Sequence, residues 1–214
     1  MGRDAVLAAV RTALTGVVQP ALATLEPAAA PDARSLAARF TAEARAVGTV
    51  VHDARTAAEA TGIVAEVLAA AGAKRVCAWP TPLARDVAAG AVRGDTTIAL
   101  DVVDGATPTD TVADADVGVT EADALIAASG TLVLTAAGRP RTVSLLPPVH
   151  VAVAPVTRLV PDLGAALRLV RGDTRPDTCI TLVTGPSRTA DIEKKLVVGV
   201  HGPCALHVVL LAEP

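Results

Sequence analysis

From Gly48 onward the sequence alternates between short Val-rich runs and Ala-rich segments with helical spacing. The runs "TVVHD" and "KRVCAW", for example, are separated by "TAAEATGIVAEVLAAAG". Short runs that are apolar on both sides are typical of strands with both faces buried, and a helix between successive strands leads to parallel pairing. The pattern predicts an α/β fold of three layers, in which helices cover both faces of a largely parallel sheet.

The alternation resumes after a polar stretch over residues 103–116. In sheets of this kind, ligands bind beyond the carboxyl ends of the strands, so we expect a site in the loops that follow strands. Further strands are predicted at "TTIALD", "VGV", "TLVLTA", "VHVAVAP", "CITLVT" and "ALHVVLL". Further helices are predicted at "TPLARDVAAG", "EADALIAAS", "PDLGAALRLV" and "TADIEKKLVVG".

Residues 1–48 form a predicted N-terminal segment that precedes an α/β domain over residues 49–214. Apolar side chains at helical spacing mark residues 3–18 and 35–48, and a loop rich in Pro and Ala lies between them. The total length is enough for one domain with a substantial buried core.

Charge and aromatic content exclude several classes of function. The net charge is −3, and the chain has one Trp, one Phe and no Tyr. Nucleic-acid binding needs a basic patch and stacking aromatics, so we expect no nucleic-acid partner. No apolar run approaches the roughly 18 residues that span a membrane, and the start lacks a cleavage pattern. We therefore expect a cytoplasmic protein without a membrane span.

The three cysteines, Cys77, Cys179 and Cys204, are isolated from one another in apolar contexts. Metal and cluster sites built from cysteine need closely spaced pairs such as C-x-x-C, which this sequence lacks. We therefore expect three buried, reduced thiols, and neither a metal site, an iron–sulfur cluster nor a flavin motif in this chain.

The segment "VTEADALIAASGTLVL" offers the first candidate site. Thr120 and Asp123 have the spacing of a capping box at a helix start. Ser129-Gly130-Thr131 is then predicted to be a tight return from helix to strand, with Gly130 at positive φ. Two roles stay open for Ser129 and Thr131, a turn and a ligand contact.

The segment "RTVSLLPPVHVAVAP" places His150 at the start of a strand. A lone histidine near an apolar strand is more often a hydrogen-bonded core residue than a catalyst, and we favour that role while keeping ligand contact open. Arg139 and Arg141 are expected to be solvated, with contact to an anionic group as the alternative.

The segment "TGPSRTADIEKKLVVGVHGP" is the richest in polar and turn-forming residues. A strand is predicted to enter a turn at Gly185, and a helix to start near Thr189. The amides of Ser187, Arg188 and Thr189 would then lie at the positive end of that helix, suited to a phosphate or carboxylate. Arg188 would add a charge, so the segment predicts an anion-binding pocket.

His201 lies inside a Gly/Pro turn, beside Gly202, where neither a core nor a helix requires a histidine. We therefore expect a functional role for His201. Glu193 is accounted for by its place in the first turns of the predicted helix, and acid–base chemistry is its alternative role. No nucleophile motif such as G-x-S-x-G occurs in the sequence.

The segments "GVTEADALIAASGTLVL", "SLLPPVHVAV" and "TGPSRTADIEKKLVVGVHGP", in this order, resemble the lactate-utilisation protein C family, whose members contain the LUD domain. The likeness runs from about Gly118 to Leu211. It implies a fold akin to ribose-phosphate isomerase, glucosamine-phosphate deaminase and CoA-transferase. It also implies a part, with iron–sulfur partner proteins, in oxidising L-lactate to pyruvate. One departure is Ala128, where the family pattern has an acid; Glu121 or Asp123 is a possible substitute.

Three functions remain open at this point. The chain would serve as a non-redox subunit that binds a small anionic ligand or organises iron–sulfur partners. It would alternatively be a free-standing enzyme on a small carboxylate, sugar phosphate or acyl thioester, with Arg188 holding the anion and His201 or Glu193 as acid or base. The third function is a module that senses a ligand.

Overall fold

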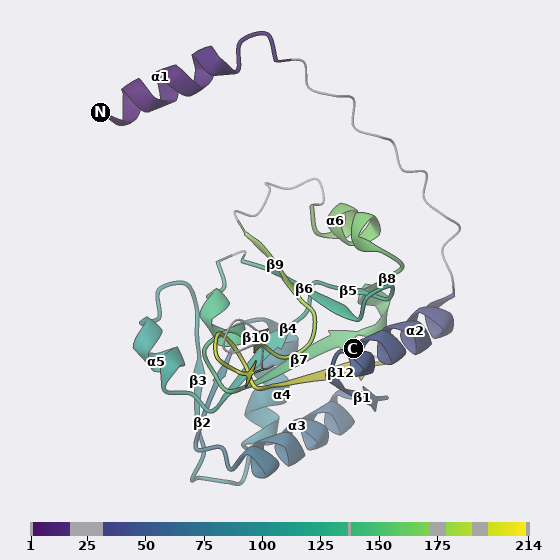
Figure 1. Cartoon of the computed structure of the whole chain (residues 1–214). Helices are drawn as coiled ribbons and strands as arrows, with labels where there is room; N and C mark the ends of the chain where they lie inside the picture. The colour runs from purple at the N-terminus through teal and green to yellow at the C-terminus, as the bar shows by residue number, and fades with distance from the viewer. Residues whose placement is uncertain (1, 18–31, 137, 172–178, 190–196, 213–214) are drawn as a thin grey trace.

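The computed structural model describes residues 2–17, 32–136, 138–171, 179–189 and 197–212 (Figure 1). The described part is built around a six-stranded sheet, with a four-stranded and a two-stranded sheet beside it. The helices are α1 (Arg3–Ala13), α2 (Ala33–Ala46), α3 (Ala57–Ala71), α4 (Pro82–Ala91), α5 (Thr109–Ala113) and α6 (Leu163–Arg171), with short 3-10 helices η1 (Arg141–Ser144) and η2 (Val156–Arg158).

The six-stranded sheet has the order β1-β12-β7-β4-β2-β3, and every pair in it is parallel. Its central strands are buried almost throughout, which is why their sequences are Val-rich on both sides. The prediction of a largely parallel central sheet is confirmed. Its strands are β1 (Val50–Ala54), β12 (Ala205–Leu211), β7 (Val149–Pro155), β4 (Val117–Glu121), β2 (Arg75–Ala78) and β3 (Ala99–Val102).

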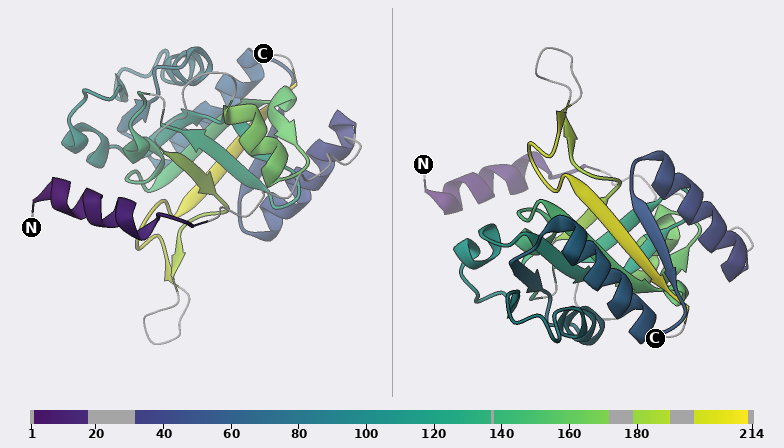
Figure 2. Two further views of the ribbon diagram at one scale, coloured as in Figure 1. Left: turned by 90° about the horizontal axis from the view of Figure 1, so that it is seen from above. Right: turned by 90° about the horizontal axis from the view of Figure 1, so that it is seen from below.

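Helices α3 and α4 cover one face of the central sheet, where they contact each other and the strands β1, β4 and β12. Figure 2 looks onto this face in its view from below. Helix α3 begins at the side chain of Thr56, which accepts the amide proton of Glu59, and ends at Gly72 in the left-handed conformation. These are the boundaries that a capped, amphipathic helix requires.

The opposite face is covered by a second sheet, where we expected helices. Its order is β8-β5-β6-β9, and helix α6 packs on its outer side (Figure 2). Leu125, Leu132 and Leu134 point from it into the main core, whereas Ile126 and Val133 join a smaller cluster under α6. Its strands are β5 (Ala124–Ile126), β6 (Thr131–Thr135), β8 (Leu159–Val160) and β9 (Ile180–Val183).

The predicted helix at "EADALIAAS" is therefore wrong, and so is the capping box at its start. Leu125 and Ile126 are buried on opposite sides of β5, which a strand between two apolar layers requires. Thr120 lies within β4 and caps no helix, and its hydroxyl contacts His150. The high helix propensity of Ala, Glu and Leu in this segment is overridden by burial on two sides.

The predicted helix at "TADIEKKLVVG" is contradicted at both ends. Strand β10 (Arg188–Thr189) pairs antiparallel with β11 (Val197–Val198), and residues 190–196 lie outside the described residues. The two valines favour a strand, and Gly199 ends it at a φ of 83°. This hairpin precedes β12, so it lies at the amino edge of the central sheet and not at the carboxyl edge where a site was expected.

The N-terminal helices differ in their burial. Asp32 caps α2 by accepting the amide proton of Ser35 at 2.9 Å, and Leu36 and Phe40 are buried in the main core. Helix α1 has the predicted apolar stripe, but all of its residues are exposed. No helix in the described part of the chain combines the length and apolarity needed to cross a bilayer.

Candidate functional site

The residues predicted from "AASGT" form a chain of hydroxyl groups. The Ser129 Oγ lies 2.7 Å from the Thr131 Oγ1, which lies 2.8 Å from the Thr184 Oγ1 at the end of β9. Gly130 has a φ of 61°, and a Cβ there would lie 2.2 Å from the backbone nitrogen of Ala44 in α2. The turn is confirmed, with a strand in place of the helix before it, and its hydroxyl groups satisfy one another.

Replacement of Thr131 by valine is expected to lower the free energy of unfolding by about 1 kcal/mol. Valine has the same shape, but it loses both hydroxyl contacts at a side chain that is 4% exposed. Chemical denaturation of the variant measures the change, with Thr12→Val on exposed α1 as the control. An unchanged denaturation midpoint in Thr131→Val would contradict a stabilising role for these hydroxyl contacts.

Residues 185–189 pack against the carboxyl end of α2, an arrangement the sequence did not predict. A Cβ on Gly185, at a φ of 78°, would lie 2.6 Å from the carbonyl oxygen of Val47, and the Arg188 guanidinium donates to the same oxygen. The amide of Ser187 donates to the carbonyl of Pro203 at 2.9 Å, and Thr189 is paired with Val197. The amides that were expected at a helix end, open to an anion, therefore lie in a hairpin.

His201 is exposed in a surface pocket of about 440 Å³. We call this the His201 pocket. Gly202 packs on Ser187, since a Cβ on Gly202 would lie 3.1 Å from the Ser187 Cβ. Glu193 lies outside the described residues. The pocket is lined by Leu145, Leu146, Gly199, Val200, His201 and Gly202.

His150 is far less accessible than His201. It is fully buried in β7, and its Nε2 lies 2.8 Å from the Thr120 Oγ1. Its Nδ1 has no hydrogen-bond partner among the described residues. Burial lowers the pKa of His150 to about 3, so the ring is neutral at physiological pH. His150 is therefore a core residue, which is the role that the sequence favoured.

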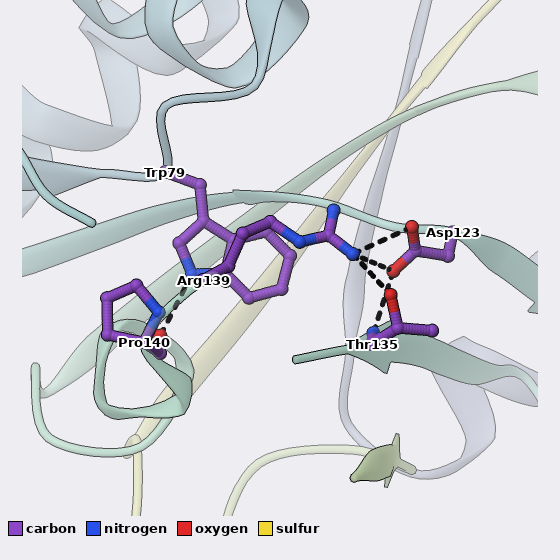
Figure 3. A network of polar contacts seen from close by, with 5 residues as sticks. All are labelled: Trp79, Asp123, Thr135, Arg139 and Pro140. Carbon is purple, nitrogen blue, oxygen red and sulfur yellow. Dashed lines mark hydrogen bonds and ion pairs between the residues drawn. The ribbon is translucent and has the colours of Figure 1, made fainter. Parts of the chain in front are cut away.

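A largely buried ionic network, which no sequence pattern indicated, lies beside the carboxyl ends of β2 and β4 (Figure 3). The Asp123 carboxylate accepts from the amide of Thr135 at 2.7 Å and from the Arg139 guanidinium at 2.9 Å. The guanidinium carbon lies 4.4 Å from the ring centroid of Trp79, whose Nε1 donates to the carbonyl of Pro140. The expectation that Arg139 is solvated is wrong, because its side chain is 11% exposed.

The carboxyl edge of the sheet also holds a cavity of about 410 Å³, the Glu121 cavity. Glu121 is the last residue of β4, and its Oε2 is buried without a hydrogen-bond partner among the described residues. From the sequence, Glu121 was a candidate only as a substitute for an acid at position 128. The sequence signal that could have identified Glu121 is its place as a glutamate at the end of a buried strand. The lining includes Leu83, Glu121, Pro155, Thr157, Arg158 and Leu169.

The cysteines are less uniform than expected. Cys77 is buried in β2, and burial raises the pKa of its thiol to about 12. Cys179 is half-buried, and Cys204 is exposed because it lies just before β12, at the rim of the sheet. Within the described ranges, no group of three or more His, Cys, Asp or Glu is arranged to hold a metal ion.

Comparison with known proteins identifies relatives for most of this fold. Proteins named "Lactate utilization protein C" are 48% identical in Macrococcus caseolyticus, over 42% of this chain and 41% of that protein, and 39% identical in Shouchella clausii, over 62% and 60%. The protein of that name in Bacillus subtilis is 42% identical over 46% of this chain and 43% of its own length. The matched regions thus cover at most 60% of these relatives.

A crystal structure of a DUF162 family protein from Deinococcus radiodurans shares the fold. It superposes with a TM-score of 0.61 at 20% identity and covers 85% of this chain and 99% of that one. The family model of the LUD domain matches residues 37–211, from the second turn of α2 to the end of β12. This chain belongs to the LUD domain family.

Proposed function

We propose that this chain takes part in lactate utilisation in the cytoplasm, as a non-redox component that binds an iron–sulfur partner protein during the oxidation of L-lactate to pyruvate. The names of its relatives in three bacteria support the pathway. The grouping of its fold with ribose-phosphate isomerase, glucosamine-phosphate deaminase and CoA-transferase is part of the same proposal.

The observation that supports partner binding is the convergence of two family motifs at the His201 pocket. "SLLPPVH" supplies Leu145 and Leu146, which are 39% and 43% exposed, and "GVHGP" supplies His201 together with Val200, which is 42% exposed. Apolar side chains that gather around a pocket, with a polar group among them, are typical of protein interfaces. A partner would insert an apolar side chain here, and His201 would supply a hydrogen bond.

Replacement of both Leu145 and Leu146 by serine is expected to reduce co-purification with the iron–sulfur partner by about tenfold or more. Growth on L-lactate should fail with it, whereas the melting temperature should change little, because both side chains lie at the surface outside the main core. Leu163→Ser in α6, at a side chain that is 44% exposed, is the matched control. A deletion strain that grows normally on L-lactate, with no iron–sulfur protein co-purifying, would overturn the proposal.

A free-standing enzyme on a small carboxylate, sugar phosphate or acyl thioester is the second candidate. It is favoured by the exposure of His201 within a pocket, where an imidazole can exchange protons with a substrate. Turnover by the purified chain alone, lost in His201→Ala, would select this candidate over the first.

A further inference from the structure

The Glu121 cavity has the features of a ligand site that the preceding proposal does not use. It lies where β4 and β7 end, at the carboxyl edge of a parallel sheet, and it extends to Leu83 at the start of α4. Ligands of open α/β sheets bind at this edge. The position alone identifies a region, and the side chains in it identify the chemistry.

Two acidic side chains at this edge, Asp123 and Glu121, differ in whether their carboxylates have hydrogen-bond donors. The carboxylate of Asp123 is satisfied by the amide of Thr135 and by Arg139. Glu121 precedes it by two positions, yet its Oε2 is buried without a hydrogen-bond partner among the described residues. A buried carboxylate oxygen that lacks a donor is costly for the folded protein. A bound molecule with a hydroxyl group would supply the missing donor.

Arg158 supplies the opposite charge on the wall of the same cavity. It is exposed at the end of η2, and within the described part of the chain it forms no ion pair with Glu121. Arg139 is held in the network with Asp123, so it is not shared with this cavity. A guanidinium that faces a cavity suits a carboxylate, which it can bind through two hydrogen bonds.

The remaining wall is largely apolar. Leu83, Pro155 and Leu169 come from three different elements and line the same cavity as the two charged groups. The ligand that satisfies all three features carries a hydroxyl donor, a carboxylate and a small apolar group. These are the groups of a small 2-hydroxy acid.

We propose that the Glu121 cavity binds a small 2-hydroxy acid, with L-lactate as the member that the proposed function supplies. The hydroxyl group donates to Glu121, the carboxylate accepts from Arg158, and the apolar substituent packs on the leucines. The choice of lactate rests on the proposed function, whereas the class of ligand rests on the cavity.

The test is titration of the purified chain with L-lactate by isothermal calorimetry at constant ionic strength. We expect saturable binding of L-lactate, and binding of propionate, which lacks the hydroxyl group, that is about tenfold weaker or less. Arg158→Ala should weaken L-lactate binding by about tenfold, while Arg34→Ala, an exposed arginine on α2, should leave it unchanged.

Glu121→Gln separates a ligand-binding role from a structural one. It should weaken L-lactate binding, yet leave the melting temperature of the free protein unchanged or higher, because it removes the charge from a side chain whose Oε2 is buried without a partner among the described residues. Absence of saturable L-lactate binding, equal affinity in Arg158→Ala, or a lower melting temperature in Glu121→Gln would each overturn the inference. None of these results affects co-purification through Leu145 and Leu146, so the two proposals fail separately.

Discussion

Replacement of Asp123 by alanine is expected to lower the free energy of unfolding by about 3 kcal/mol. The variant leaves the Arg139 guanidinium without its anion at a side chain that is 11% exposed, and it removes the acceptor of the Thr135 amide (Figure 3). A buried charge that loses its partner cannot recover its hydration, so the loss exceeds what the pair itself contributes. Urea denaturation of the wild type and the variant measures the difference.

Two further measurements test whether burial of the Arg139 charge causes this loss of stability. In a double-mutant cycle, Asp123→Ala should cost much less when Arg139 is already alanine, because no charge is then stranded. Glu59→Ala removes an ion pair with Arg55, whose side chain is 86% exposed, and should change stability far less. Equal losses in Glu59→Ala and Asp123→Ala would contradict this account of the network.

The central sheet was predictable because the amino-acid composition of its strands indicates that both of their faces are buried. Residues 149–155 and 205–211 are apolar on both sides, and only a strand covered on both faces needs that pattern. The α3 boundaries were equally readable, because Thr56 and Gly72 are local capping residues. In these elements, local preference and tertiary position agree.

The second sheet was predictable only in part. Its strands β6 and β9 match the predicted strands "TLVLTA" and "CITLVT", whereas its shortest strands, β5 and β8, depend on the layers that cover them. Ala124–Ile126 has three buried residues, too few to distinguish a strand from a helical turn by periodicity. The β10–β11 pairing was hidden for a related reason: the charged residues between its strands have helical spacing.

The candidate sites show the same limit. The Gly130 turn and the core position of His150 followed from the chemistry of single residues. The Asp123–Arg139 pair joins the end of β4 to the loop after β6, and the Glu121 cavity joins β4 to η2 and α6. Contacts of this kind depend on how the sheets stack, so a single sequence contains no local pattern for them.

Replacement of His150 by leucine is expected to reverse the order of stability between neutral and acidic pH. The pKa of His150 is about 3 in the folded protein, against an ordinary value of 6.5. Between these values the unfolded chain binds more protons than the folded one, so the wild type loses stability as the pH falls, by at most about 1.4 kcal/mol per pH unit. By pH 4 this loss reaches about 3 kcal/mol, and a leucine does not incur it.

At pH 7 the wild type should be the more stable, by about 1–2 kcal/mol, because leucine leaves the buried Thr120 hydroxyl without its partner. Urea denaturation at pH 7 and at pH 4 should show the crossover. His52 and His207, whose pKa values burial also lowers, are present in both proteins and cancel in the comparison.

The double variant His150→Leu with Thr120→Val separates the contribution of the hydrogen bond to stability from the contribution of histidine protonation. It removes donor and acceptor together, so it should recover most of the loss at pH 7 and keep the gain at pH 4. Parallel stability curves for His150→Leu and the wild type across this pH range would show that the imidazole becomes protonated without unfolding. His150 would then need access to water or to a charged group, and its assignment to the core would be wrong.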